Sequence, residues 1–273
     1  MCELFAMSSR HPVDVRFSLE EFSRHGGLAG PHKDGWGIAW YEDDDVRLVK
    51  EPKAAADSPC LRFIQDHPFR ASTVLSHIRK ATQGRNTLAN SQPTARELGG
   101  HMHVFAHNGD LAGAPLRKVF HLGRFHPVGE TDSEYAFCAL VERLAPIWRA
   151  PKQVPLMDER LSLIAQFAER LRALGPANFL YADGDALFVH AHKRTHADGI
   201  RPPGLHVLSR ACKAGPGAIA VEGLSIAPVD GAQEVVLVAS VPLTGFEAWA
   251  PLGEGEILAV QSGQIVARRH AHK

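Results

Sequence analysis

The sequence has no excess of charge of either sign, because 30 lysines and arginines are balanced by 30 aspartates and glutamates. A chain without a basic surplus lacks the electrostatic footprint of a protein that binds nucleic acid or an anionic membrane. We therefore expect neither as a partner. A small neutral or zwitterionic substrate fits this composition better.

Cysteine is scarce, and the four cysteines (Cys2, Cys60, Cys138 and Cys212) are scattered along the chain. Their spacing matches neither a metal site nor a disulfide framework, which is typical of a reducing compartment. Long apolar runs are also missing, since no segment reaches the ~20 residues that a membrane-spanning helix needs. The N-terminus has no basic stretch leading into an apolar run. We expect a cytoplasmic protein.

The 273 residues contain 45% hydrophobic amino acids, enough for the core of one large domain or two small ones. Apolar periodicity predicts strands, then helices, then strands again. Helices are expected over residues 18–25, 58–67, 135–144 and 157–174, and a long loop over 82–100. Strands are expected over residues 3–7, 36–41, 46–50, 73–79, 101–107, 178–181, 187–192, 205–209, 235–239, 257–261 and 264–268. This order is not the regular alternation of a doubly wound parallel sheet.

Cys2 stands directly after the initiator methionine. If Met1 is removed, Cys2 carries a free α-amino group beside its thiol, and the two groups form a nucleophile with its own general base. The alternative is a small buried residue at the start of a strand. A chain that keeps Met1 has no amine on Cys2, so we expect that form to be inactive.

Three further positions admit a structural or a chemical interpretation. Arg79 follows a predicted buried strand, where its planar fork is suited either to a carboxylate or to a surface ion pair. Asn108-Gly109 is a turn signal, but it also offers a side-chain amide and an unhindered backbone N–H to an oxyanion. Asp132, like Thr131, is placed to cap the helix that follows.

Five segments with these residues occur in a fixed order: Cys2, Ser76 to Thr82, Asn90 to Pro93, His107 to Gly109 and Thr131 to Glu134. Together they resemble the glutaminase domain of the class II glutamine amidotransferases, which are N-terminal nucleophile hydrolases. The motifs cover residues 2–145, and Asp34-Gly35-Trp36-Gly37 is similar to the stand-alone, YafJ-like branch. The resemblance implies an α+β fold, a four-layer αββα sandwich of two antiparallel sheets between helical layers. It also implies a single glutamine amidotransferase type 2 domain over residues 1–273.

The resemblance assigns catalytic roles to three residues. Cys2 would attack the γ-amide carbon of glutamine and form a glutamyl thioester, releasing ammonia and then glutamate. Asn108, through its side-chain amide, and Gly109, through its backbone N–H, would form the oxyanion hole. No cofactor and no metal are implied.

The resemblance assigns substrate binding to three more residues. Arg79, helped by Thr82, would hold the α-carboxylate, and Asp132 would pair with the α-ammonium. Many family members carry a histidine where this chain has Gln92, so no role is transferred to that position.

Other functions stay open at this stage. The same pocket would accept a γ-glutamyl conjugate instead of glutamine, and a partner enzyme that accepts the ammonia is not identified. The chain could instead bind a metal through the pairs His101/His103, His190/His192 and His270/His272, among its 16 histidines. A regulatory protein that only binds glutamine is a third alternative, which the complete set of catalytic residues disfavours.

Overall fold

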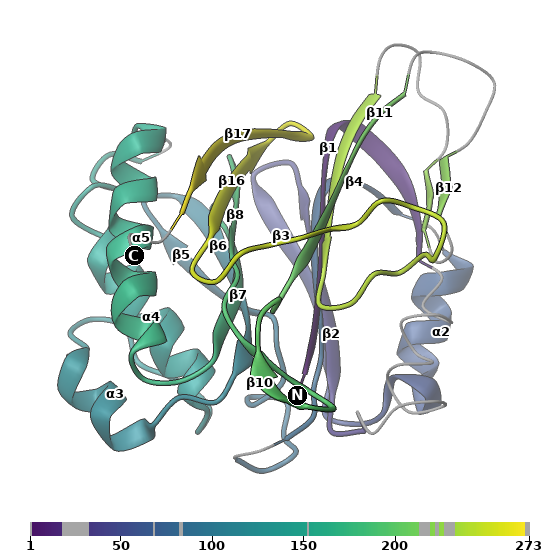
Figure 1. Cartoon of the computed structure of the whole chain (residues 1–273). Coiled ribbons are helices and arrows are strands. Elements are labelled where there is room, and N and C mark those ends of the chain that lie inside the picture. The colour runs from purple at the N-terminus through teal and green to yellow at the C-terminus, as the bar shows by residue number, and fades with distance from the viewer. Residues whose placement is uncertain are drawn as a thin grey trace.

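A computed structural model describes residues 2–17, 33–67, 69–81, 84–151, 153–212, 219–221, 224–226 and 233–270. Within these ranges, two antiparallel sheets lie face to face and helices cover their outer sides (Figure 1). The predicted αββα sandwich is therefore confirmed. The predicted helix over 18–25 lies outside the described residues.

The first sheet has nine strands, and β1 runs through its centre in the order β15-β11-β14-β1-β4-β2-β3, with β12 and β13 continuing beside β1. Its strands are β1 (Glu3–Phe17), β2 (Trp36–Glu42), β3 (Asp45–Glu51), β4 (Phe69–Ile78), β11 (His206–Cys212), β12 (Ile219–Val221), β13 (Leu224–Ile226), β14 (Gln233–Ala239) and β15 (Ala250–Pro251). Glu3 pairs with Ile78. The Cys2 end of β1 therefore lies beside the end of β4 that leads into Arg79.

The second sheet has six strands in the order β17-β16-β8-β7-β6-β5. They are β5 (Thr94–Leu98), β6 (His101–Gly109), β7 (Ala177–Ala182), β8 (Leu187–His190), β16 (Ile257–Gln261) and β17 (Gln264–Arg269), while β9 (Arg194–His196) and β10 (Gly199–Arg201) form a separate hairpin. Strands β7 and β8 are buried along their whole length. This burial explains why their sequences read as apolar runs.

The side-chain alternation of the central strands separates an inner core from two outer ones. Leu4 and Ala6 of β1 face Val104 and Ala106 of β6 in the core between the sheets. Phe5 and its alternating neighbours face the opposite side, where α2 (Pro59–Asp66) and the short η2 (Ala55–Asp57) lie. Because successive strand residues point to opposite faces, Cys2 and Asn108 belong to the inner faces of their sheets.

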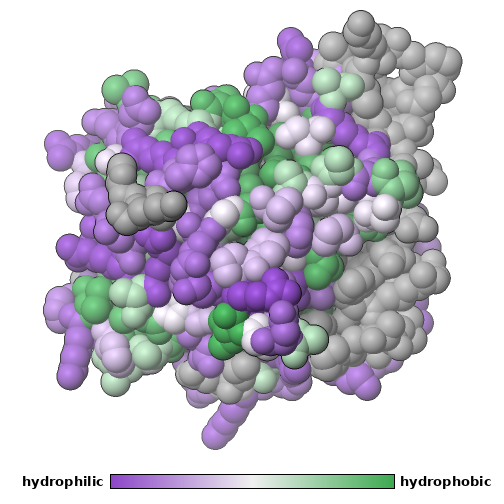
Figure 2. All heavy atoms as spheres, in the orientation of Figure 1, coloured by the Kyte–Doolittle hydropathy of each residue, from purple (hydrophilic) through white to green (hydrophobic). Residues whose placement is uncertain are grey.

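Helices α3 (Gly113–Val119), α4 (Asp132–Leu144) and α5 (Met157–Arg172) cover the six-stranded sheet (Figure 1). The apolar stripe predicted for the third of these is confirmed, since Leu161, Ile164, Phe167 and Leu171 are all buried. No helix of the described residues is long and apolar enough to cross a membrane. Hydrophilic residues are spread over much of the face shown in Figure 2.

Some local features of the structure differ from the predictions. The expected loop over 82–100 contains β5, which pairs with β6. Asn108-Gly109 forms the end of β6, pairing with Asn178 and Ala177, rather than a turn. Helix α3 was not predicted, because its N-cap residue Ala112 makes no side-chain cap and the helix is only 7 residues long.

Candidate active site

Cys2 lies at the start of β1 with its side chain half-buried. Its Sγ accepts a hydrogen bond from the backbone N–H of Lys80 at 3.3 Å and lies 3.4 Å from the carbonyl oxygen of the same residue, to which the thiol donates. Burial raises the pKa of the Cys2 thiol, and the Lys80 N–H and the charge of Arg79 oppose this shift only in part. The thiol is therefore held in place but is protonated at neutral pH without a base.

Asn108 approaches Cys2 from the opposite sheet. Its Nδ2 donates a hydrogen bond of 2.5 Å to the carbonyl oxygen of Cys2, and the Asn108 side chain is fully buried. The backbone of Asn108 is fixed by Asn178 on β7, whose Nδ2 donates to the Asn108 carbonyl at 3.1 Å. An amide nitrogen carries two hydrogens, so Asn108 can hold Cys2 with one and keep the other for a ligand.

Gly109 is required at its position for steric reasons. A Cβ added there would lie 1.8 Å from the carbonyl oxygen of Pro176 and 2.7 Å from Nε2 of His107. Any side chain would therefore push β6 away from the segment that leads into β7. The sequence suggests that Gly109 has an unhindered backbone. In the structure this backbone is closely packed, and there is no room for a Cβ.

Arg79 is buried, with 3% of its surface exposed, so the alternative of a surface ion pair is excluded. Its guanidinium donates to the carbonyl oxygens of Gly84 at 3.2 Å and Arg85 at 3.1 Å, and to Oδ1 of Asn86 at 3.0 Å. Residues 84–86 thus hold the fork of Arg79 in one orientation. Thr82, the predicted helper of Arg79, lies outside the described residues.

Asp34 organises the backbone on the other side of Arg79. Its carboxylate accepts hydrogen bonds from the Ala81 N–H at 2.8 Å and from Nδ2 of Asn86 at 3.0 Å. The Arg79 N–H in turn donates to the Gly35 carbonyl at 2.8 Å. The Asp34-Gly35 segment therefore braces the turn that delivers both Arg79 and the Lys80 backbone to Cys2.

Asp132 is the first residue of α4, and the N-cap is Thr131, whose Oγ1 accepts from the Glu134 N–H at 3.2 Å. The carboxylate of Asp132 accepts from the Leu111 N–H at 2.7 Å and from the Ser133 N–H at 2.8 Å. Asp132 is close enough to Cys2 to raise the pKa of the thiol. It therefore lies between the start of α4 and the segment that follows Gly109.

Two residues to which the sequence assigned no role support the site. The side chain of Gln92 pairs with both backbone groups of His107, because its Oε1 accepts from the His107 N–H at 2.7 Å and its Nε2 donates to the His107 carbonyl at 3.3 Å. Asn178 is the second, through its bond to Asn108. The segment Asn90 to Pro93 was the one sequence signal that included Gln92. No sequence signal pointed to Asn178.

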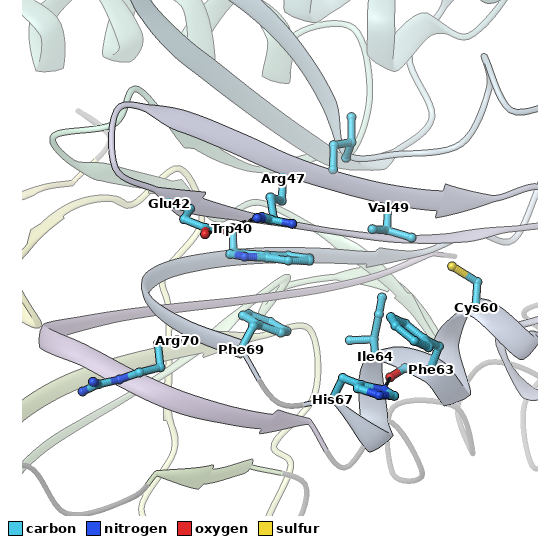
Figure 3. Close-up of a pocket in the computed structure, with 11 residues that line it drawn as sticks. Trp40, Glu42, Arg47, Val49, Cys60, Phe63, Ile64, His67, Phe69 and Arg70 are labelled. Carbon is cyan, nitrogen blue, oxygen red and sulfur yellow. Dashed lines mark hydrogen bonds and ion pairs between the residues drawn. The ribbon is translucent and has the colours of Figure 1, made fainter.

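A separate cavity of about 820 Å³ lies on the outer face of the nine-stranded sheet, against α2 (Figure 3). The rings of Trp40 and Phe69 stack in this cavity with their centroids 4.1 Å apart. Phe63, His67 and Cys60 line its other side. None of the predicted site residues lines it.

Of the three histidine pairs, His101/His103 and His190/His192 lie within the described residues, whereas His272 of the third pair lies outside them. Among the described residues, no group of three histidine, cysteine, aspartate or glutamate side chains is placed to hold a metal ion. Nδ1 of His103 is hydrogen-bonded to the Tyr181 hydroxyl at 2.6 Å, and Nδ1 of His190 is hydrogen-bonded to the Ala177 carbonyl oxygen at 2.7 Å. Burial lowers the pKa of His103 to about 4 and that of His190 to about 3, so both are neutral core residues at pH 7.

Comparison with known proteins shows which family the chain matches. A family model described as "Glutamine amidotransferases class-II" matches residues 1–273. The chain is 38% identical over 259 residues to the candidate glutamine amidotransferase YafJ of Escherichia coli, covering 94% of this chain and 96% of that one. It is 32% identical over 277 residues to a candidate glutamine amidotransferase of Haemophilus influenzae, covering 98% and 86% of the two chains.

Solved structures give the same fold. The crystal structure of a predicted glutamine amidotransferase from Pseudomonas aeruginosa matches with a TM-score of 0.70 and 33% identity, covering 97% of this chain and 100% of that chain. The glutamine phosphoribosylpyrophosphate amidotransferase of B. subtilis matches with a TM-score of 0.60 at 16% identity, covering 98% of this chain and 49% of that chain, a likeness of fold alone.

Proposed function

Because the chain belongs to the class II glutamine amidotransferase family, we propose that it hydrolyses the γ-amide of glutamine through a Cys2 glutamyl thioester, releasing ammonia and glutamate. One observation carries the proposal most directly. The amide of Asn108 reaches the backbone of Cys2 from the opposite sheet at 2.5 Å. The residue proposed as oxyanion donor and the residue proposed as nucleophile therefore lie in contact where the two sheets come together.

In the first half of the reaction, the α-amine freed by removal of Met1 takes the proton from the Cys2 thiol. A base is needed because burial raises the pKa of this thiol. The thiolate attacks the carbonyl carbon of the γ-amide, a C–S bond forms and the carbonyl electrons move to oxygen. Nδ2 of Asn108 and the Gly109 N–H stabilise that oxyanion. The C–N bond then breaks, and the amine returns the proton to the departing ammonia.

In the second half, water attacks the thioester and gives up one proton to the amine, again through an oxyanion. Collapse breaks the C–S bond, the thiol recovers its proton and glutamate leaves. Arg79 binds the α-carboxylate and Asp132 the α-ammonium, which orients the carbonyl carbon of the γ-amide toward Sγ. Both side chains act on the pKa of Cys2, Arg79 lowering it and Asp132 raising it, which supports their placement around one ligand.

The test is a turnover assay on protein shown by intact mass to begin at Cys2. We expect ammonia release from glutamine, and little or none from protein that retains Met1. Amine release from γ-glutamyl conjugates is measured in parallel. Glutamine turning over faster than every conjugate supports the proposal, whereas a conjugate that turns over much faster assigns the same Cys2 chemistry to a γ-glutamyl hydrolase. Full activity in the form retaining Met1 would contradict the mechanism.

A further inference from the structure

The two carboxylate oxygens of Asp132 are bound to different segments of the chain. Oδ2 accepts from the Leu111 N–H at 2.7 Å, and Oδ1 accepts from the Ser133 N–H at 2.8 Å. Leu111 is fully buried and follows Gly109 after one intervening residue. The carboxylate therefore connects the first turn of α4 with the end of the Asn108-Gly109 segment.

A second contact reaches the other side of that segment. The Ser133 hydroxyl lies 3.4 Å from Oδ1 of Asp132 and 2.9 Å from Nδ1 of His107, the residue before Asn108. Burial lowers the pKa of His107, so its ring is neutral and Ser133 is its hydrogen-bonding partner on the Nδ1 side. Asp132 and Ser133 together hold the backbone both before and after the predicted oxyanion donors.

These contacts are strong enough to position backbone. A carboxylate that accepts a short hydrogen bond from a backbone N–H makes a charge-assisted bond, roughly twice as strong as a neutral one. The start of a helix also favours a negative charge, and Asp132 is the first residue of α4. The orientation of this side chain is thus fixed before any substrate arrives.

We propose that Asp132 has a second task besides binding the α-ammonium: through Leu111 it is a positioning residue for the oxyanion donors Asn108 and Gly109. This inference rests on the proposed function. One carboxylate then serves both substrate recognition and transition-state stabilisation. Loss of its charge affects mainly binding, and loss of its bond to Leu111 affects mainly the chemical step.

Two substitutions separate these effects. Asp132→Asn and Asp132→Ala both remove the charge that faces the ammonium, but only the asparagine keeps an oxygen for the Leu111 N–H. We expect KM for glutamine to rise in both variants. We expect kcat to stay near that of the wild type in Asp132→Asn and to fall about tenfold or more in Asp132→Ala, a fraction of the effect of deleting an oxyanion donor outright.

Two further readouts identify the cause. Hydrogen exchange at the Leu111 amide should be faster in Asp132→Ala than in Asp132→Asn, because only the alanine leaves this N–H without an acceptor. Alkylation of Cys2 by iodoacetamide uses neither the oxyanion hole nor the ammonium site. Its rate should rise slightly and equally in both variants, since Asp132 raises the pKa of the thiol.

Glu142 provides a matched control on the same helix. Its Oε1 accepts from the Gly123 N–H at 2.9 Å and the Phe125 N–H at 2.6 Å, the same kind of contact away from Cys2. Glu142→Ala should leave kcat and KM unchanged. Equal kcat values in the two Asp132 variants, or a similar fall of kcat in Glu142→Ala, would overturn the inference alone. Wild-type protein beginning at Cys2 that turns over neither glutamine nor any γ-glutamyl compound would overturn the proposed function and the inference with it.

Discussion

Two regions of the molecule each contain a half-buried cysteine, and they differ in almost everything else. Cys2 faces the space between the sheets, where Lys80 and Asn108 contact it. Cys60 lines the cavity of about 820 Å³ on the outer face, on the opposite side from the stacked rings of Trp40 and Phe69 (Figure 3). Backbone and side-chain donors converge on Cys2 in the first region, whereas the second is a cavity lined by aromatic and apolar side chains together with Glu42, Arg47 and Arg70.

The comparison separates the cavity from the residues proposed to carry the chemistry. An apolar cavity of this size is the usual first hypothesis for a binding site. The residues proposed for acyl transfer lie elsewhere, at the ends of β1, β4 and β6, where hydrogen bonds to the backbone hold Cys2, Asn108 and Arg79.

Replacing the two cysteines in turn tests this difference most strongly. Cys2→Ala should lower kcat for glutamine by at least ~10³-fold, because the nucleophile is lost. Cys60→Ala should leave kcat within about twofold of the wild type, since Cys60 has no part in the proposed chemistry. Ammonia release measured on both variants checks the pair. A larger loss in Cys60→Ala than in Cys2→Ala would reverse the assignment of the two regions.

Asn108→Asp tests the contribution of the opposing sheet. The aspartate keeps the shape of the side chain but removes both N–H donors, so kcat should fall about 10²-fold with a smaller change in KM. Steady-state kinetics with glutamine measure both parameters. A normal kcat in a correctly folded variant would show that Asn108 does not stabilise the oxyanion.

The pH dependence of Cys2 alkylation measures the burial of the thiol. Burial favours the neutral form and raises the pKa of Cys2, so the thiolate appears only at higher pH. In protein that retains Met1, the iodoacetamide rate should therefore rise with pH and reach its midpoint above that of glutathione measured in parallel. A midpoint below that of glutathione would show that burial does not dominate the pKa of the Cys2 thiol.

The smallest effect is expected in the cavity. Phe63 lies at the edge of the cavity, with 60% of its surface exposed. Phe63→Ser should therefore change the free energy of unfolding by no more than about 0.5 kcal/mol and leave kcat unchanged. Chemical denaturation and the ammonia assay measure the two quantities. A clear loss of activity would mean that the cavity contributes to the reaction.

The parts of the structure that the sequence predicted correctly depend on local signals. The end of β4 before Arg79, the cap at Thr131 and the apolar stripe of α5 follow from residues close together in the chain. The order of the motifs then predicted the family, which the comparisons confirm. The roles assigned to the site residues remain predictions: Cys2, Asn108, Gly109, Arg79, Thr82 and Asp132.

The parts that were missed depend on contacts between distant segments. Gln92 pairs with the backbone of His107, and Asn178 with that of Asn108, 70 residues away. No local sequence pattern predicts that a side-chain amide hydrogen-bonds to the backbone of a distant strand, where a neighbouring strand would otherwise pair. The polar residues around Arg10 likewise concealed the length of β1, which continues past an irregularity between Ser8 and Val13 to Phe17.

The most direct test of the central claim is peptide mapping after incubation with a diazo-ketone analogue of glutamine, using protein that begins at Cys2. This reagent alkylates a nucleophile beside a pocket that accepts a glutamine head group. We predict a single adduct on Cys2 that excess glutamine prevents and that Arg79→Ala abolishes. An adduct on Cys60, or a Cys2 adduct that glutamine does not prevent, would contradict the account.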